Sequence, residues 1–141
     1  MHTIAFATYR KAPELSEEDQ AVAAQLALRH ISVQAAVWND PAVQWDHFAA
    51  VIIRTSWDYH QRPAEFRQWL DRLARGGVPL WNPGALVRWN MDKTYLRELA
   101  QRGVSIVPTV WLAQGSAVQL SAVLAEQGWQ QAVVKPAISA S

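Results

Sequence analysis

The stretch Ala49-Ala50-Val51-Ile52-Ile53-Arg54-Thr55 decides the fold of this chain. It is apolar from Ala49 through Ile53, and its three central residues are β-branched, which favours a strand. The polar–apolar alternation of a half-exposed strand is absent, so we predict a strand that is covered on both faces. Such strands are typical of parallel sheets with helices on both sides. The stretch therefore predicts an α/β protein.

Strands and helices alternate around this stretch. Ser16 is placed to cap a helix that has Asp19 in its first turn. A second helix begins near Pro63 and ends at Gly76, and its predicted apolar stripe is Phe66, Trp69, Leu70 and Leu73. Strand–helix alternation favours a parallel sheet flanked by helices, because parallel strands need crossover connections. The predicted strands are residues 4–9, 32–38, 49–55 and 78–81, and the predicted helices are residues 14–30 and 63–75.

The turn Asn82-Pro83-Gly84 is a predicted domain edge. We predict a first domain at residues 1–83 and the start of a second domain at residues 84–141. The second part has fewer than sixty residues, which are few for a self-sufficient core. Its predicted elements are helices at residues 92–102 and 117–127 and strands at residues 106–112 and 132–135.

Composition excludes several classes of protein. Among 141 residues, 50% are hydrophobic and 18% are charged, as in ordinary globular domains. The net charge is +1 with the signs interspersed, so the basic stripe that binds nucleic acid is absent. The absence of cysteine excludes disulfides and thiolate metal sites. The N-terminal apolar run is too short for a membrane span and lacks the pattern of a secretory signal, so we expect a cytoplasmic protein without a membrane partner.

Two common nucleotide-binding motifs are missing. Neither G-x-G-x-x-G nor G-x-x-x-x-G-K-[ST] occurs in the sequence. Lys93 instead lies in the first turn of a predicted helix, and a helix N-terminus beside a lysine favours a bound anion. The alternative is that Asp92 caps this helix and that Lys93 is a solvated surface residue.

Lys135 is the second candidate for binding an anion. It follows the apolar run 132–134, and Pro136 then removes a backbone donor. A charge at the end of an apolar strand normally faces a crevice or a partner, because isolated burial costs several kcal/mol. The alternative is a lysine that protects an edge strand from aggregation.

The loop after the decisive strand offers groups that suit a small polar ligand. Arg54, Ser56, Trp57 and Tyr59 supply a guanidinium, a hydroxyl, an indole and a phenol. Open parallel sheets bind ligands outside the carboxyl ends of their strands, so we predict that these four residues bind a substrate with a carboxylate. The alternative is a plain strand-to-helix connection whose aromatic rings pack on the sheet.

A small hydrolase with its catalytic residues on the same loop is the least favoured of the functions considered. Ser56, Asp58 and His60 have the residue types of a catalytic triad, but their adjacent placement gives the wrong geometry for a relay. The histidines also show no metal-ligand spacing, so we assign no metal ligand.

The order of the motifs resembles the ATP-grasp superfamily of carboxylate–amine ligases, the group that contains glutathione synthetase and D-alanine–D-alanine ligase. The motifs are Met91-Asp92-Lys93, Val107-Pro108-Thr109 and Val133-Val134-Lys135-Pro136. Upstream, residues 54–60 and Trp81-Asn82-Pro83 look like the subgroup near the cyclo-ligase of cycloserine biosynthesis. The resemblance spans the chain at the level of element order, while each motif is short.

The resemblance implies roles for individual residues. Lys93 and Lys135 would hold the phosphates of ATP, and Ser139 and Ser141 would lie in the small-residue loop over the triphosphate. That loop is usually rich in glycine in the family and is built of alanine and serine here. Residues 1–83 would form the pre-ATP-grasp domain, which helps to bind the acceptor substrate.

The resemblance also implies a reaction. Such ligases transfer the terminal phosphate of ATP to a carboxylate, and an amine then displaces phosphate from the acyl phosphate. Both reacting groups are anionic, so lysines and Mg²⁺ would offset their repulsion. The sequence has no acidic loop for Mg²⁺, and the family places its metal ligands and its adenine-binding hinge further along, beyond Ser141.

The leading interpretation is therefore the N-terminal part of an ATP-dependent ligase for small-molecule carboxylate and amine substrates. It is expected to be inactive as this fragment, and its catalytic residues are not identified. The competing interpretation is a self-contained α/β module that binds a small molecule or regulates, without catalysis.

Overall fold

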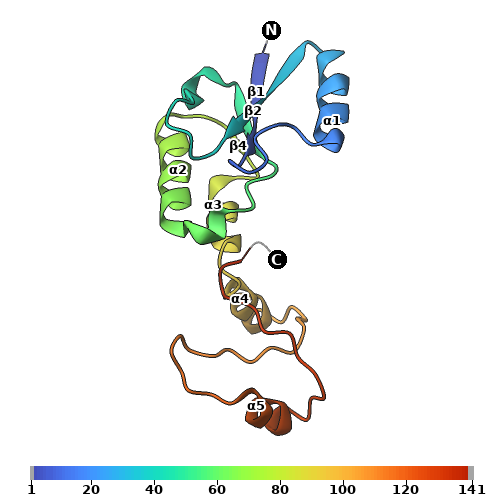
Figure 1. The fold of residues 1–141 in the computed structure, drawn as a ribbon, viewed down its shortest axis with the longest axis vertical. Coiled ribbons are helices and arrows are strands. Elements are labelled where there is room, and N and C mark those ends of the chain that lie inside the picture. The colour runs from blue at the N-terminus through green and yellow to red at the C-terminus, as the bar shows by residue number, and fades with distance from the viewer. Residues whose placement is uncertain (1, 140–141) are drawn as a thin grey trace. The chain divides into compact units, whose positions relative to one another are not determined.

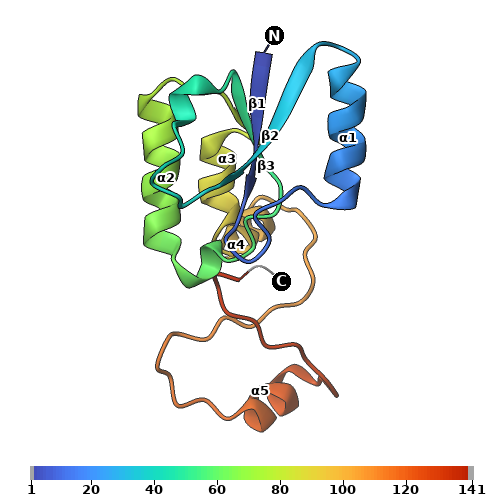
Figure 2. The same ribbon diagram turned by 45° about the horizontal axis from the view of Figure 1, so that its top comes forward.

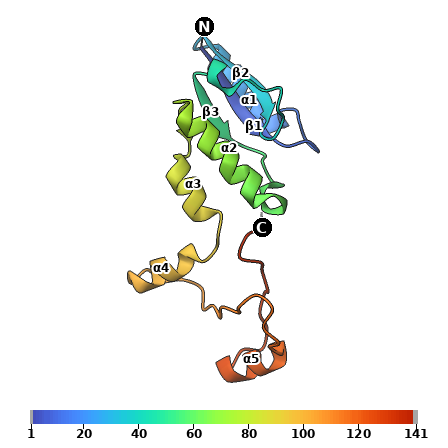
Figure 3. The same cartoon turned by 90° about the vertical axis from the view of Figure 1, so that its left-hand side faces the viewer.

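A computed structural model describes residues 2–139 of the chain. The contacts divide it into two compact units, residues 2–92 with 138–139 and residues 93–137. Figures 1, 2 and 3 show the elements of both units. The first unit extends past the predicted edge at residue 83, because helix α3 (Gly84–Asn90) contacts the preceding helix. The assignment of a substrate-side domain and an ATP-binding domain stays a prediction.

The first unit is built on a four-stranded parallel sheet with the strand order β2-β1-β3-β4. In the register of this sheet, Phe6 lies opposite Ala35 on one side and Ile52 on the other. The prediction of an α/β fold with a parallel sheet is confirmed. The strands are β1 (His2–Thr8), β2 (Ile31–Val37), β3 (Ala50–Ile53) and β4 (Leu80–Trp81).

Helices cover both faces of the sheet. Helix α1 (Glu17–Ala27) lies on one side, and α2 (Pro63–Arg75) lies with α3 on the other (Figure 2). The predicted N-cap is confirmed, because the hydroxyl of Ser16 accepts a hydrogen bond from the backbone N–H of Asp19 at 3.2 Å. Two short 3-10 turns, η1 (Trp45–His47) and η2 (Tyr59–Gln61), flank β3 in the chain.

Large aromatic rings fill the core between the sheet and α2. Small residues of β1 make room for them, because Ala5 and Ala7 lie in the same cluster as the buried face of α2. The Trp38 ring meets the Phe66 ring edge-on at 5.1 Å between centroids. The apolar stripe predicted for α2 is confirmed, since its fully buried residues are Phe66, Trp69, Leu70 and Leu73.

The second unit contains two helices, α4 (Tyr95–Gln101) and α5 (Leu120–Gln127). The strands predicted at residues 106–112 and 132–135 are wrong for this structure, because no strand is described among residues 93–137. Val133 is 81% exposed and Val134 is 69% exposed. An apolar run forms a strand only beside a neighbour that accepts its backbone hydrogen bonds, and the described part of this unit supplies none.

The region around Lys93 also differs from the prediction. The predicted helix at residues 92–102 begins only at Tyr95, with Thr94 at its N-cap. Asp92 therefore does not cap the helix, and Lys93 lies in the turn before it.

Within residues 2–139, every helix is too short or too polar to cross a membrane.

The core makes a testable prediction about stability. Replacing Trp69, which is fully buried, by alanine should lower the free energy of unfolding by about 3–5 kcal/mol, because the cavity cannot close. Urea unfolding followed by circular dichroism measures this loss. Leu28→Ala is the control, because Leu28 is 75% exposed and its removal should change the free energy by about 0.5 kcal/mol or less. Equal effects of the two changes would contradict the described core.

Candidate functional site

The candidate site lies at the carboxyl ends of β1 and β3. In the sheet, β1 has β2 on one side and β3 on the other, so the chain reverses its direction of winding between these neighbours. Ligands of open parallel sheets bind at such a switch point. The loops that leave the sheet there are residues 9–16, which lead to α1, and residues 54–62, which lead to α2.

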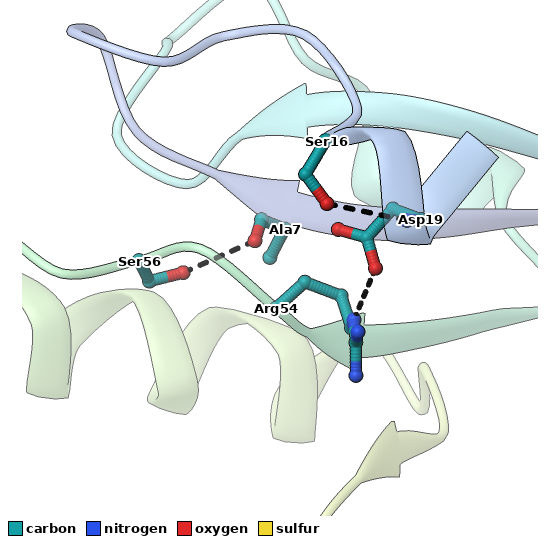
Figure 4. Close-up of polar contacts among 5 residues, drawn as sticks. All are labelled: Ala7, Ser16, Asp19, Arg54 and Ser56. Carbon is teal, nitrogen blue, oxygen red and sulfur yellow. Dashed lines mark hydrogen bonds and ion pairs between the residues drawn. The ribbon is translucent and has the colours of Figure 1, made fainter. Parts of the chain in front are cut away.

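One carbonyl group fastens the second loop to the sheet. The carbonyl oxygen of Ala7 accepts the backbone N–H groups of Arg54 at 3.2 Å and Thr55 at 3.1 Å. The hydroxyl of Ser56 donates to the same oxygen at 3.3 Å (Figure 4). These contacts fix the direction in which the loop leaves β3.

Arg54 is held by an ion pair to the first turn of α1. Its Nε atom donates to Oδ1 of Asp19 at 2.6 Å (Figure 4), and its guanidinium lies over the Phe6 ring at 5.8 Å from the centroid. The Asp19 side chain is 1% exposed, whereas the Arg54 side chain is 42% exposed. Asp19 is not among the site residues predicted from the sequence, since its only signal there is an acidic residue in the first turn of a helix.

Glu18 adds a second carboxylate near this pair. Its pKa is lowered, first by a hydrogen bond to its own backbone, then by the Ser16 hydroxyl, and also by the positive charge of Arg54. Glu18 is exposed, in contrast to Asp19. With Glu17, the charges at this end of α1 therefore comprise one buried carboxylate, two exposed carboxylates and the guanidinium.

The aromatic residues of the loop occupy different environments. Trp57 is 60% exposed, with its ring 6.2 Å from that of Tyr9 across the two loops. The Tyr59 hydroxyl donates to the carbonyl oxygen of Ser139 at 3.0 Å, and burial raises the pKa of the Tyr59 phenol. The raised pKa favours the protonated phenol, which is the form that donates this hydrogen bond.

The loop does not form a hydrolase relay. Ser56 is 3% exposed and its hydroxyl is directed at the sheet. His60 places Nδ1 at 2.8 Å from the carbonyl oxygen of Trp57, and Asp58 accepts a hydrogen bond from Nε1 of Trp38 at 2.7 Å. A nucleophile needs a base within hydrogen-bond reach, and these three residues have other partners.

The two candidate lysines lie in the second unit. The backbone N–H of Lys93 donates to the carbonyl oxygen of Ala137 at 2.7 Å, so the main chain at Lys93 lies beside the segment that follows Lys135. Lys135 is exposed. Ser139 belongs to the first unit, and Ser141 lies outside the described residues. The phosphate-binding roles of these residues stay predictions.

Two further features lie outside this site. Residues 2–139 contain no group of three or more acidic or histidine side chains that could hold a metal ion. A hollow of about 390 Å³ is lined by residues near the starts of the strands rather than their carboxyl ends, and we do not place the substrate there because the cationic groups are elsewhere. Its lining residues are Thr3, Gln34, Ala42, Val43, Gln44, His47 and Phe48.

Comparison with known proteins gives concordant matches. The family described as D-cycloserine synthetase DcsG, N-terminal domain, matches residues 4–82. The cycloserine biosynthesis protein DcsG of Streptomyces lavendulae is 40% identical over 92 residues, which are 64% of this chain and 30% of the relative. The crystal structure of D-cycloserine synthetase DcsG matches with a TM-score of 0.70 and 32% identity, covering 89% of this chain and 43% of that one. The chain thus spans less than half the length of the proteins it matches.

The ion pair of the site makes a prediction about stability. Arg54→Met should lower the free energy of unfolding by about 1–3 kcal/mol, because it leaves the buried Asp19 carboxylate without its partner. Arg88→Met is the matched control, since Arg88 pairs with Asp71 at 2.7 Å on the surface and should contribute less than about 1 kcal/mol. Chemical denaturation of both variants measures the difference. A loss at Arg54 no larger than the loss at Arg88 would contradict the structural role of the pair.

Proposed function

Because this chain belongs to the family of the D-cycloserine synthetase DcsG N-terminal domain, we propose that it is the N-terminal part of an ATP-dependent carboxylate–amine ligase of the ATP-grasp superfamily. The observation that carries this proposal is the family match over residues 4–82. The structural similarity to the synthetase supports it, because that similarity covers 89% of the chain and so extends into the second unit. The order of the short motifs around Lys93 and Lys135 supports the superfamily assignment.

In this proposal the ligase transfers the terminal phosphate of ATP to a substrate carboxylate, and an amine then displaces phosphate from the acyl phosphate to form an amide. Lys93 and Lys135 would bind the phosphates and offset the repulsion between the two anions. The hydrogen bond between the Lys93 and Ala137 main chains supports a shared site, since it brings the two lysine segments together.

Magnesium would add positive charge to the bound phosphates. The described residues do not fit a magnesium site, because no group of three acidic or histidine side chains converges among them. We therefore assign no step of the reaction to a metal held by residues 2–139.

The first unit would bind the small-molecule substrate. Arg54 presents a partly exposed guanidinium at the carboxyl ends of the strands, and Trp57, three residues later in the chain, presents an exposed indole. Tyr59 and Ser56 would shape the same loop through their hydrogen bonds to Ser139 and Ala7. This arrangement suits recognition of a carboxylate by charge and of the remaining ligand by stacking.

A second candidate function is a binding module without catalysis. The exposure of Lys135 favours it, because a solvated lysine needs no ligand to be explained. In that case Lys93 and Lys135 would contribute nothing to nucleotide binding, which separates the two candidates experimentally.

Nucleotide binding tests the proposal. Lys135→Ala should weaken ATP binding by the 141-residue chain at least tenfold and leave the thermal unfolding temperature unchanged, because the exposed ammonium would contact the ligand rather than the fold. Isothermal titration calorimetry measures the affinity. Lys11→Ala is the control, since Lys11 is an exposed lysine of the first unit and should keep the parent affinity. Equal ATP affinity in parent and Lys135→Ala chains would favour the module without catalysis.

Turnover by this chain gives a further prediction. We expect no ADP release above background when the chain is mixed with ATP, Mg²⁺ and a panel of amino acids, because the described residues lack a magnesium site. A coupled spectrophotometric assay measures ADP, with the Lys135→Ala chain as the background. Release that depends on one amino acid and disappears in Lys135→Ala would show that the fragment is active.

A further inference from the structure

Asp19 is an unusual residue for its position. Its side chain is 1% exposed, and its Oδ2 atom has no hydrogen-bond partner among the described residues. Leaving a buried carboxylate oxygen unpaired costs stability, and an apolar residue there would avoid that cost. Buried polar groups that break this rule are expected chiefly at functional sites.

Arg54, the partner of Asp19, keeps most of its hydrogen-bond donors available. A guanidinium has five N–H donors, and Arg54 uses only the one on Nε toward Asp19. The two terminal nitrogens make no hydrogen bond to residues 2–139, and the dashed line from Arg54 in Figure 4 is its bond to Asp19. Contact with the Phe6 ring further limits the orientation of the group.

The same two residues lie where a ligand is expected. Arg54 directly follows β3, and Asp19 lies in the first turn of α1, so the ion pair spans the switch point between β1 and β3. A pre-oriented guanidinium with two free nitrogens matches the two oxygens of a carboxylate in a bidentate pair.

We propose that Asp19 is a positioning residue, which orients Arg54 so that its two terminal nitrogens bind the carboxylate of a small amino-acid substrate. This inference rests on the proposed function, in which the first unit binds the substrate. Asp19 itself does not contact the ligand, since its oxygens are buried. It acts through Arg54, by fixing the guanidinium before the ligand arrives and so reducing the entropy lost on binding.

Glu18 explains why an amino acid suits the site better than a simple anion. Glu18 precedes Asp19 in the first turn of α1, and its carboxylate is exposed. It would repel a ligand that carries only negative charge and attract the ammonium group of an amino acid. Arg54, Asp19 and Glu18 together carry a net charge of −1, so a ligand that has an ammonium group as well as a carboxylate is favoured over a simple anion.

The test compares two probes that differ only in the carboxylate. D-Serine and D-serinamide are titrated into the 141-residue chain, and binding is followed by two-dimensional ¹H–¹⁵N NMR, which also observes the Arg54 Nε–H. We expect the parent chain to bind D-serine at least tenfold more tightly than D-serinamide. We expect Asp19→Ala to lose this preference and the protected Nε–H signal together.

Two further variants serve as a control and as a substitute for Asp19→Ala. Asp71→Ala removes the carboxylate from the comparable pair with Arg88, and it should leave the D-serine preference unchanged. If Asp19→Ala does not fold, Arg54→Lys is used, because it keeps the charge and loses the planar fork; it should also lose the preference. A parent chain without the preference, or an Asp19→Ala or Arg54→Lys chain that retains it, would overturn the inference.

ATP titration of the same samples separates this inference from the proposed function. Selective D-serine binding that depends on Asp19, in a chain whose ATP affinity is indifferent to Lys135, would support the carboxylate site and contradict the ligase. ATP binding that depends on Lys135, without a preference for D-serine over D-serinamide, would support the ligase and contradict the carboxylate site.

Discussion

The pairing of β3 with β1 is the constraint on which the site depends. Both strands run in the same direction, so their carboxyl ends meet at one edge of the sheet. At that edge the carbonyl oxygen of Ala7 accepts hydrogen bonds from Arg54, Thr55 and Ser56. These contacts form only where β3 is held beside β1. Val51 of β3 lies in the same core cluster as Phe66 and Trp69 of α2, and burial of these residues holds the strand in place. Burial of an apolar strand thus fixes the starting point of a polar loop.

The charges at this edge depend on each other. Arg54 donates to the buried carboxylate of Asp19, and this bond together with the contact to the Phe6 ring orients the guanidinium. The Ser16 cap starts α1 at the residue that places Asp19 in the first turn. A helix cap, a strand end and an ion pair therefore determine together where the guanidinium points, and this is the property that a carboxylate ligand requires.

The sequence predicted the first unit better than the second. The α/β class, the N-cap at Ser16 and the buried face of α2 follow from periodicity and capping, which are local signals. The apolar runs near Val107 and Val133 carry the same signal as a buried strand, but no neighbouring strand is described in that unit. Strand formation depends on a partner remote in sequence, so a local pattern could not decide it.

The sequence by itself determined which residues are candidates for a site: a cationic and aromatic loop after a buried strand, and two lysines whose order resembles that of a ligase family. Only the tertiary structure decided that Arg54 pairs with Asp19, 35 positions away, while Ser56 is directed into the sheet. The physical reason is that side-chain type and spacing specify local conformation, whereas burial, ion pairing and orientation arise where segments distant in sequence meet.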